Sequence, residues 1–600
     1  MWQRLSPRAR WGLLVALVAL ALAALDVWWF ETYRHNFPFD VDEAGYTTFG
    51  LVDYLGLKSG GIGGWWEAIQ NQPTFAPLVP AVTSLLVFVK PGLLDGFATL
   101  TFFAVVLALA AYAIGERLAG PRLGALAAIV TATLPGTFAF SREYIFALPT
   151  AAFLSLAVFF LLKSEGMRRS RWAAICGVAV GLMLLSRTMA ISYVPGLLVA
   201  ALVAILARRE GDLPKRFLNL GLTALVAVAV AATWYARNLQ SVIDYLTNYG
   251  YGSQSKNYGK EHALLSWGRF HSVAEHMTTE DLFLPLALLF LVALAALAVL
   301  VLRRLGDPDS RASTWRRLAA SDALSVAIVF VLGYGALMTS QNGGDGFTFP
   351  IAALLPCIAV LAIKAYPRAA VPAAGLVGLI AAVNLVSTAT IWSFASHTRL
   401  VSVPGFEEPF PVTKGVPKAV FAIRLQVPGP ETVFDRRDEG WPRADREVTG
   451  LLAGLYGPHG EGPVVAFASR NRAISSNTVQ LATVGKYHRG IFFTQLSAEP
   501  NDSVRTYRRQ LSDPAFGQPT VLMTTSSNAG DFPPLVTQAY AIAAAKQLGF
   551  RRIHTLTLPD GRRLAMWRKR PAGSDQAPQP RQLLQQHRDR ERDDDQAGHG

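Results

Sequence analysis

Charged residues are scarce in this 600-residue chain: Asp, Glu, Lys and Arg make up 16% of it, whereas hydrophobic residues make up 51%. Soluble domains carry about 25% charged residues, so the composition excludes an ordinary soluble protein. Apolar runs recur through the first two thirds of the chain, most of them near the ~20 residues that cross a bilayer. The sequence therefore predicts a polytopic α-helical membrane protein.

Cysteine is almost absent as well. The two that occur, Cys176 and Cys357, lie inside apolar runs, so no disulfide framework is expected. The formal net charge is +14, but Arg and Lys cluster in short loops between apolar runs. That distribution is typical of topology determinants in a membrane protein, and we expect the lipid bilayer as a partner and no nucleic acid.

We expect about eleven transmembrane helices, the first of them retained and not cleaved as a signal peptide. The expected spans are 11–30, 93–115, 121–138, 146–162, 171–186, 191–207, 216–233, 281–302, 320–339, 348–364 and 370–391. The run 75–89 contains Pro77 and Pro80, which favour an amphipathic helix in the membrane interface over a full span.

Basic residues in the short loops predict the orientation. Those that precede the first span place the N-terminus in the cytoplasm. The basic residues of this and the alternate loops are Arg4, Arg8, Arg10, Arg117, Arg122, Lys163, Arg168, Arg169, Arg171, Arg208, Arg209, Lys215, Arg216, Arg303, Arg304, Arg311, Arg316 and Arg317. With an odd number of spans, the C-terminal region is extracytoplasmic, and we expect a multi-pass protein of the plasma (inner) membrane.

The opposite face carries a different set of charges. The exterior loop 31–92 contains FPFDVDEAGYTTFG, with Asp42 and Glu43 near its start, and the short exterior loops carry the isolated arginines Arg142, Arg187 and Arg237. A charge at bilayer depth costs at least ~2.5–3.5 kcal/mol, so such residues are usually paired or line a polar cavity. Snorkelling of the arginines to lipid headgroups is the alternative.

Together these residue types predict a transferase site. Arginine binds phosphate through two parallel hydrogen bonds, and a carboxylate can accept a proton from an attacking hydroxyl. Nucleotides are not present outside the cytoplasm, so the sugar donor would be a lipid-linked phosphosugar.

Three motifs resemble those of the C-type (GT-C) membrane glycosyltransferases. DEAGY (42–46) looks like the DEARY-type motif of the lipid A aminoarabinose transferases and the protein O-mannosyltransferases. ATWYARN (232–238) resembles a WYxRN segment, and GLMLLSRTMAISYVPGLL (181–198) is similar to an element that usually has Lys in place of Arg187. The resemblance covers about residues 10–390 and implies inverting transfer from a polyprenyl-phosphate sugar at the extracytoplasmic face.

The resemblance also implies roles for individual residues. Asp42 would be the general base, and Glu43 would orient the acceptor or hold neighbouring cations. Arg187 and Arg237 would bind the donor phosphate and stabilise charge on the leaving group. The remaining substrate- and donor-binding candidates are Tyr46, Lys58, Arg142, Glu143, Tyr235 and Asn238. For Lys58, in the flexible stretch LKSGGIGG, a solvated loop lysine is the alternative.

Two elements depart from the family pattern. FSREYIFALP (140–149) has Ala147 where an acidic residue is expected, so either Glu143 takes that role or this chain lacks the carboxylate. GFTFPIAALLP (346–356) keeps the prolines of a late family element and lacks its arginine. The donor type and any divalent metal are therefore left open.

Two further segments carry weaker signals. HSVAEH (271–276) has histidines on one helical face but lacks the HExxH spacing, so we favour an interfacial helix that lines the cavity over a zinc site. NYGYGSQSKNYGK (248–260) fits no nucleotide-binding loop and is predicted to be a mobile exterior loop that covers the cavity.

The chain changes character after about residue 392. We expect a transmembrane domain at 1–392, a soluble extracytoplasmic α/β domain at 393–570 and a disordered tail at 571–600. Strands are predicted at 463–469 and 519–526, a helix at 533–550, and a hairpin around Asp560-Gly561.

The rivals to a glycosyltransferase are a secondary transporter and a non-catalytic polysaccharide-assembly protein. The sequence shows no convincing internal repeat of the kind found in transporters. It leaves the acceptor open as a glycan, a lipid or a protein.

Overall fold

The computed structural model describes residues 5–33, 39–89, 96–208, 212–252, 255, 262–344, 346–388, 400–401, 421–422, 440–456, 462–471, 473–488, 490–499, 502–529, 531 and 534–569. The chain divides into two compact units. Unit 1 comprises residues 1–32 and 56–433, and unit 2 comprises residues 33–55 and 434–600. The predicted tail at 571–600 lies outside the described residues, as does most of 389–439.

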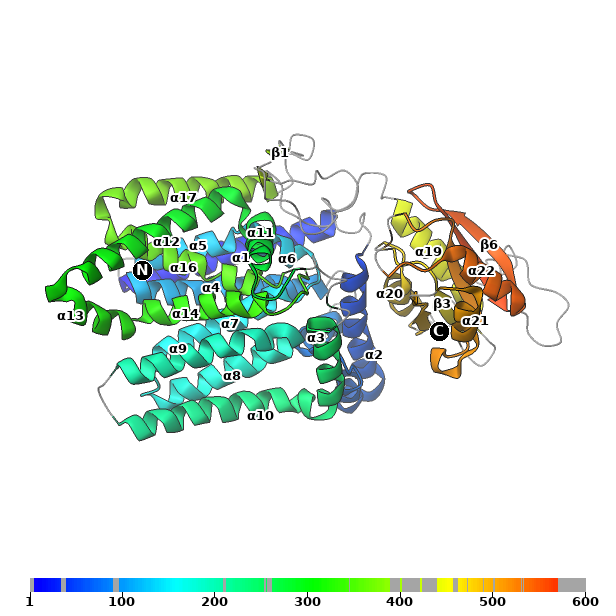
Figure 1. The fold of residues 1–600 in the computed structure, drawn as a ribbon, viewed down its shortest axis with the longest axis horizontal. Coiled ribbons are helices and arrows are strands. Elements are labelled where there is room, and N and C mark those ends of the chain that lie inside the picture. Colours follow the sequence, from blue (N-terminus) through cyan, green and yellow to red (C-terminus); the bar gives the residue numbers. More distant parts are fainter. Residues whose placement is uncertain are drawn as a thin grey trace. The chain divides into compact units, whose positions relative to one another are not determined.

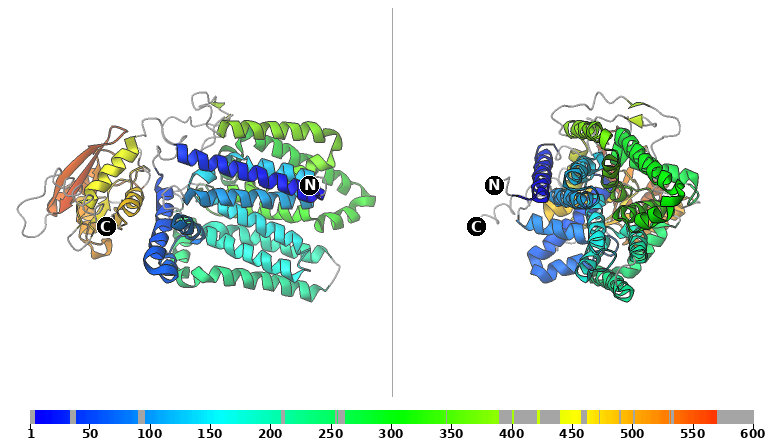
Figure 2. Two further views of the ribbon diagram at one scale, coloured as in Figure 1. Left: turned by 180° about the vertical axis from the view of Figure 1, so that it is seen from behind. Right: turned by 90° about the vertical axis from the view of Figure 1, so that its left-hand side faces the viewer.

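Unit 1 is built of helices, most of which run side by side (Figures 1 and 2). Helix α4 packs against α5 and α7, and α8 packs against α7 and α10. The elements of unit 1 are α1 (Pro7–Tyr33), α3 (Leu78–Val89), α4 (Phe97–Ala119), α5 (Pro121–Ala132), α6 (Pro135–Arg142), α7 (Ala147–Lys163), α8 (Ser170–Ser186), η4 (Thr188–Tyr193), α9 (Val194–Ala207), α10 (Leu213–Tyr245), η5 (Leu246–Gly250), α11 (Trp267–His276), η7 (Met277–Leu282), α12 (Phe283–Gly306), α13 (Pro308–Ala319), α14 (Asp322–Met338), α15 (Phe349–Ala352), α16 (Leu355–Ala365), α17 (Pro367–Thr388) and the short antiparallel strands β1 (Leu400–Val401) and β2 (Phe421–Ala422).

Each predicted span coincides with a helix or a bent pair of helices. Among the described residues, five helices are long and apolar enough to cross a membrane, and up to seven spans result if two bent pairs are counted. The spans predicted at 146–162, 171–186, 348–364 and 370–391 correspond to shorter apolar helices. The helical membrane fold is confirmed, whereas the number of eleven spans stays a prediction.

Proline explains one of the bends. The span predicted at 121–138 consists of α5 and α6, which meet at 49°. Pro135 occupies the first turn of α6, and Leu134 before it is extended, with φ −60° and ψ 141°. A proline is tolerated in the first turn of a helix, and it disfavours helical geometry in the residue that precedes it. The chain therefore starts a new helix there and does not continue α5.

Several of the predicted cytoplasmic loops meet at one end of unit 1. Arg117 at the end of α4 and Arg208 after α9 both form ion pairs with Asp322 at the start of α14. Arg216 near the start of α10 is buried and donates to the carbonyls of Gly166 (2.7 Å) and Ala204 (2.9 Å). These contacts agree with the predicted grouping of the basic loops on one side.

Helix α2 (Val41–Gln70) begins in unit 2 and ends in unit 1. The stretch LKSGGIGG, predicted to be flexible, is helical on both sides of a break at Gly61, which has φ +60°. A Cβ on Gly56 would lie 2.7 Å from the carbonyl oxygen of Gly64, and one on Gly64 would lie 2.5 Å from that of Gly56. Glycine is therefore needed both at the break and where the two arms touch.

Unit 2 contains a five-stranded sheet in the order β4-β3-β5-β7-β6. Strands β4, β3 and β5 are parallel, and β7 is antiparallel to both β5 and β6. Its elements are α19 (Gly440–Ala453), β3 (Val464–Phe467), α20 (Ser476–Tyr487), β4 (Phe492–Gln495), α21 (Val504–Ser512), η10 (Pro514–Phe516), β5 (Val521–Thr525), α22 (Gln538–Gln547), β6 (Phe550–Thr557) and β7 (Arg563–Lys569). The predicted strands, helix and hairpin are all present.

The buried core of unit 2 explains why the predicted strands and helix form. Strand β5 is buried along its whole length, as expected for a central strand covered on both faces. Ala466, Leu522, Leu511 and Ala544 belong to one buried cluster that joins the sheet to α21 and α22. The apolar runs of the sequence therefore become the inner strands, and the hairpin of β6 and β7 adds to one side.

Candidate functional site

Arg187 lies at the end of α8, where the chain leaves the helix with φ −158° and ψ 129°. It lines a small cavity in unit 1. The other lining residues are Met189, Ala190, Ser192, Tyr193, Tyr251, Ala336, Leu337, Ser340, Asn342 and Phe347.

The guanidinium of Arg187 is held by an aromatic ring. Its central carbon lies 4.1 Å from the ring centroid of Phe347, and the hydroxyl of Tyr193 donates to the backbone carbonyl of Phe347. Two sequence elements singled out above, 181–198 and 346–356, therefore meet at one cavity. The second element, 346–356, lacks an arginine, and the first element supplies Arg187 at the same cavity.

The start of the predicted exterior loop 248–260 also lies at this cavity. Tyr251 lines it, and the carbonyls of Tyr249 and Gly250 accept hydrogen bonds from Asn342 and Ser340, respectively. These contacts fix the described beginning of the loop to the segment after α14. Residues 253–254 and 256–261 lie outside the described part of the chain.

Three predicted residues lie on α10. Tyr235 donates to the carbonyl of Leu184 (3.0 Å), and Asn238 donates to that of Gln70 (3.3 Å). Arg237 is exposed and donates to the side-chain oxygen of Asn71 (2.9 Å). Tyr235 and Asn238 thus join α10 to neighbouring helices, whereas the charge of Arg237 faces outward from α10.

Arg142, at the end of α6, is buried and paired with an acid that the sequence analysis did not single out. Its Nε lies 3.1 Å from Asp26 of α1, and the hydroxyl of Ser141 donates to the same carboxylate at 2.7 Å. The guanidinium also lies over the Trp29 ring, 4.4 Å from its centroid. A lone carboxylate inside the apolar run 11–30 was the signal that could have found Asp26.

The predicted acidic motif forms the start of α2, in unit 2. The backbone N–H of Asp40 donates to the carboxylate of Glu43 (3.3 Å), and that of Asp42 donates to the carboxylate of Asp40 (3.2 Å). Glu43 is 1% exposed, whereas Asp42 is exposed. Carboxylates are favourable at a helix N-terminus because they complement the helix dipole.

A residue of the C-terminal sequence holds this motif. The side-chain amide of Asn477, in the first turn of α20, donates to the carbonyl of Val41 at 2.8 Å. A Cβ on Gly45 would lie 3.0 Å from the same amide nitrogen. The glycine of DEAGY therefore lets α20 approach the helix that carries Asp42.

The other predicted residues have less distinctive surroundings. Lys58 is exposed on α2, three residues before the break at Gly61. Glu143 is extended, directly after α6, and Tyr46 is half-buried on α2. Asp42, Glu43 and Tyr46 belong to unit 2, whereas Lys58, Arg142, Glu143, Arg187, Tyr235, Arg237 and Asn238 belong to unit 1.

The described residues include no group of three or more His, Cys, Asp or Glu side chains that could hold a metal ion. HSVAEH lies in the helix α11, as predicted, and His271 Nδ1 lies 4.0 Å from Glu275 Oε2 within it.

Comparisons with known proteins show which membrane proteins the chain resembles. Residues 76–234 match the family model described as dolichyl-phosphate-mannose-protein mannosyltransferase. Together with the solved structures below, this confirms the resemblance of the chain to the C-type membrane glycosyltransferases. Among curated proteins, none matches the chain.

The similar solved structures include ArnT from Cupriavidus metallidurans. The form bound to undecaprenyl phosphate is 14% identical, with a TM-score of 0.54, and the match covers 94% of this chain and 99% of that one. The apo form is 13% identical, with a TM-score of 0.52 and coverage of 94% and 98%. At this identity the likeness establishes the fold, which extends over nearly the whole of both chains.

Proposed function

We propose that this protein is a membrane glycosyltransferase that takes its sugar from a polyprenyl-phosphate donor at the extracytoplasmic face of the plasma membrane. The observation that carries the proposal is Arg187, whose guanidinium is stacked on Phe347 at the edge of a small cavity. An arginine supplies parallel hydrogen bonds to a phosphate and keeps its charge at every relevant pH. The similar ArnT structure was solved with undecaprenyl phosphate bound, which supports the same class of lipid carrier here.

Asp42 is the proposed general base. It is exposed at the start of α2, so an acceptor hydroxyl can reach it. The acceptor hydroxyl attacks the anomeric carbon on the side opposite the phosphate, which inverts the configuration. The proton of that hydroxyl passes to the Asp42 carboxylate. Arg187 stabilises the negative charge that grows on the leaving phosphate. Arg237, which extends outward from α10, is the second proposed phosphate ligand.

The remaining predicted residues have supporting roles in this proposal. Glu43, buried against the backbone of Asp40, shapes the turn that presents Asp42. Lys58 and Tyr46 contact the donor or acceptor. Arg142 and Glu143 lie at the end of α6, and Tyr235 and Asn238 fix α10 against its neighbours. The acceptor class remains a glycan, a lipid or a protein.

Binding of the lipid carrier tests the phosphate site directly. In purified protein, native mass spectrometry with undecaprenyl phosphate should show binding that is at least tenfold weaker in Arg187→Ala. The matched control is Arg316→Ala, because Arg316 is exposed on α13 and lies in a predicted cytoplasmic loop. Equal binding by the wild type and Arg187→Ala would refute the phosphate assignment.

Transfer is tested in cells. Mass spectrometry of cell-envelope glycans from a strain lacking the protein should reveal a missing substituent, restored by the wild type and not by Asp42→Asn. Restoration by Asp42→Asn would remove Asp42 from its role. An unchanged glycan profile with altered solute uptake would favour the transporter alternative.

A further inference from the structure

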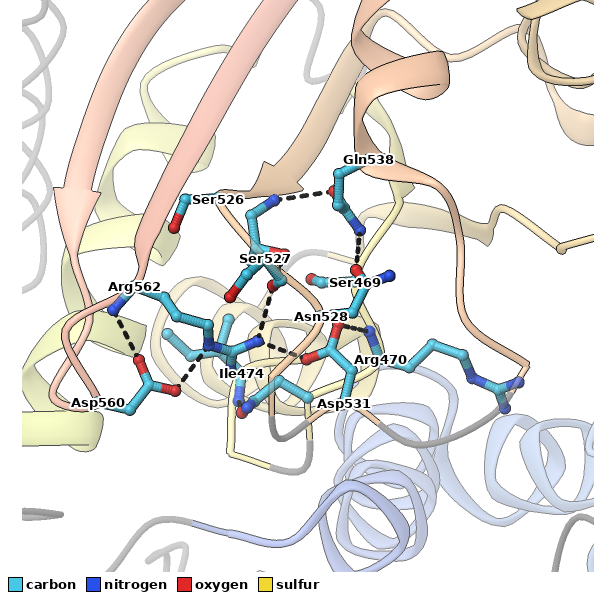
Figure 3. A network of polar contacts seen from close by, with 12 residues as sticks. Ser469, Arg470, Ile474, Ser526, Ser527, Asn528, Asp531, Gln538, Asp560 and Arg562 are labelled. Carbon is cyan, nitrogen blue, oxygen red and sulfur yellow. Dashed lines mark hydrogen bonds and ion pairs between the residues drawn. The ribbon is translucent and has the colours of Figure 1, made fainter. Parts of the chain in front are cut away.

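We infer that the carboxyl ends of strands β3 and β5 form a second binding site, and that its ligand is a neutral saccharide. The chain runs from β3 to β4 on one side and then returns to β5 on the other side of β3. In open α/β sheets, ligands bind outside the carboxyl ends of the parallel strands at such a switch point. Figure 3 shows a dense group of polar side chains there.

An ion-pair network organises the site. Arg562, which precedes β7, contacts Asp531 through Nη1 and Asp560 through Nε, both at 2.7 Å. The second oxygen of Asp531 accepts from the backbone N–H of Arg470, after β3, at 3.0 Å. The Asp531 carboxylate therefore ties the segment after β3 to Arg562 (Figure 3).

Gln538 holds the two strand ends in a fixed arrangement. Its Nε2 donates to the carbonyl of Ala468 (2.7 Å) and to the side-chain oxygen of Asn528 (3.0 Å). Its Oε1 accepts from the backbone N–H of Thr525 (3.0 Å). A site whose walls are fixed in this way loses little entropy when a ligand binds.

Two donors in this preformed arrangement are buried and have no partner among the described residues. The Ser469 hydroxyl lies directly after β3, and Ser469 is 1% exposed. Nη2 of Arg562 is likewise unpaired, and Arg562 is 5% exposed. Buried polar groups are almost always hydrogen-bonded, because leaving one unpaired is costly. Unpaired donors at a switch point therefore indicate a missing ligand.

The charged side chains around the two donors indicate which kind of ligand the site binds. Asp531, Asp560, Arg470 and Arg562 sum to zero, so the site offers no net attraction for phosphate or carboxylate. A carboxylate has about four lone-pair sites, and Asp531 uses two of those for Arg562 and Arg470. A sugar hydroxyl can accept from Arg562 Nη2 and donate to a carboxylate lone pair, and a neighbouring hydroxyl can pair with Ser469. An array of adjacent hydroxyl groups is the signature of a saccharide.

Unit 2 also contains Asp42, and the carbonyl of the preceding residue, Val41, accepts a hydrogen bond from Asn477 in the N-terminal turn of α20. The segment after β3 leads directly into that turn. The bound saccharide is therefore part of the acceptor substrate. This assignment to the acceptor is the only part of the inference that rests on the proposed function.

The test uses the full-length protein in nanodiscs and saturation-transfer NMR with mannose, glucose, galactose and arabinose as separate probes. At least one sugar should bind, and Ser469→Ala should weaken it roughly three- to tenfold, the effect of one lost hydrogen bond. Because Ser469 makes no side-chain hydrogen bond to a described residue, the variant should unfold at an equal or higher temperature. Ser512→Ala, at an exposed position ending α21, is the matched control.

Three results would overturn the inference: no binding of any sugar, binding unchanged in Ser469→Ala, or displacement of the sugar by inorganic phosphate. Arg562→Lys gives a second measurement, because it removes Nη2 and keeps the charge. It should abolish sugar binding and lower the unfolding temperature. Asp42→Asn should retain sugar binding while transfer is lost, so failure of the proposed function is distinguishable from failure of this site.

Discussion

The side-chain amide of Asn477 donates a hydrogen bond to the backbone carbonyl of Val41, 2.8 Å away and 436 residues earlier in the chain. Val41 directly precedes Asp42 and begins the helix that carries the DEAGY motif. The C-terminal α/β sequence therefore supports the acidic motif through one defined contact. This contact makes the role of the C-terminal region testable.

Asn477→Ala should lower kcat for sugar transfer about tenfold and leave KM for the lipid donor unchanged, because the base is displaced and the phosphate site is not. Asn477→Asp should behave in the same way, since an ionised carboxylate cannot donate to the Val41 carbonyl. Gly45→Ala should also reduce kcat, because its Cβ would crowd the Asn477 amide. The control is Gln547→Ala at an exposed position of α22. A change in KM alone would contradict a positioning role.

Phe347→Leu should weaken undecaprenyl phosphate binding roughly two- to thirtyfold, because a cation–π contact is worth about 0.5–2 kcal/mol. The ring lies 4.1 Å from the Arg187 guanidinium and fixes its direction. Native mass spectrometry measures the effect. Phe102→Leu, at an exposed position of α4, controls for loss of a ring. Binding that depends on Arg187 but not on Phe347 would show that the guanidinium needs no orientation.

Asp26→Leu should strongly destabilise the protein, by about 3–5 kcal/mol, because it leaves Arg142 without its buried counter-charge. The double variant Asp26→Leu/Arg142→Met should recover most of that loss, since replacing a whole buried ion pair by apolar residues is often neutral. Thermal unfolding in detergent measures both. The double variant also separates two roles of Arg142: stability without transfer activity indicates a direct role in the reaction, and recovery of both indicates a structural one.

Asp445 predicts a pH dependence of stability in unit 2. Burial raises the pKa of its carboxyl from 3.8 to about 7, although a hydrogen bond with Thr478 and the charge of Arg446 act in the opposite direction. Between these two pKa values the folded state binds more protons than the unfolded state, so the free energy of unfolding falls as pH rises from about 4 to about 7. The contribution of Asp445 to the free energy of unfolding is therefore largest in acid and is lost above pH 7.

Thermal unfolding of the full-length protein between pH 5 and pH 8 measures this effect. Asp445→Asn should flatten the pH dependence and raise the unfolding temperature most at pH 8, while Glu67→Gln, at an exposed position of α2, should change neither. An unaltered slope in Asp445→Asn would assign the pH dependence to other groups.

The membrane helices and the α/β region were predictable because each depends on local pattern. In lipid, every backbone N–H and C=O must be satisfied within the segment, so an apolar run of sufficient length becomes a helix. The paired strands and the Asp560-Gly561 hairpin follow from apolar runs and turn chemistry in the same way. The bend before Pro135 was not predicted, although proline was its signal.

The sequence by itself determined the class of fold and the residue types available for a site: an acidic motif, isolated arginines and basic loops. Only the tertiary structure decided which of them meet. It paired Arg142 with Asp26, placed Arg187 on Phe347 and joined Asn477 to Val41. The physical reason is that helices and strands follow from periodicity along the chain, whereas contacts between distant side chains depend on how whole elements pack, and no local pattern records that.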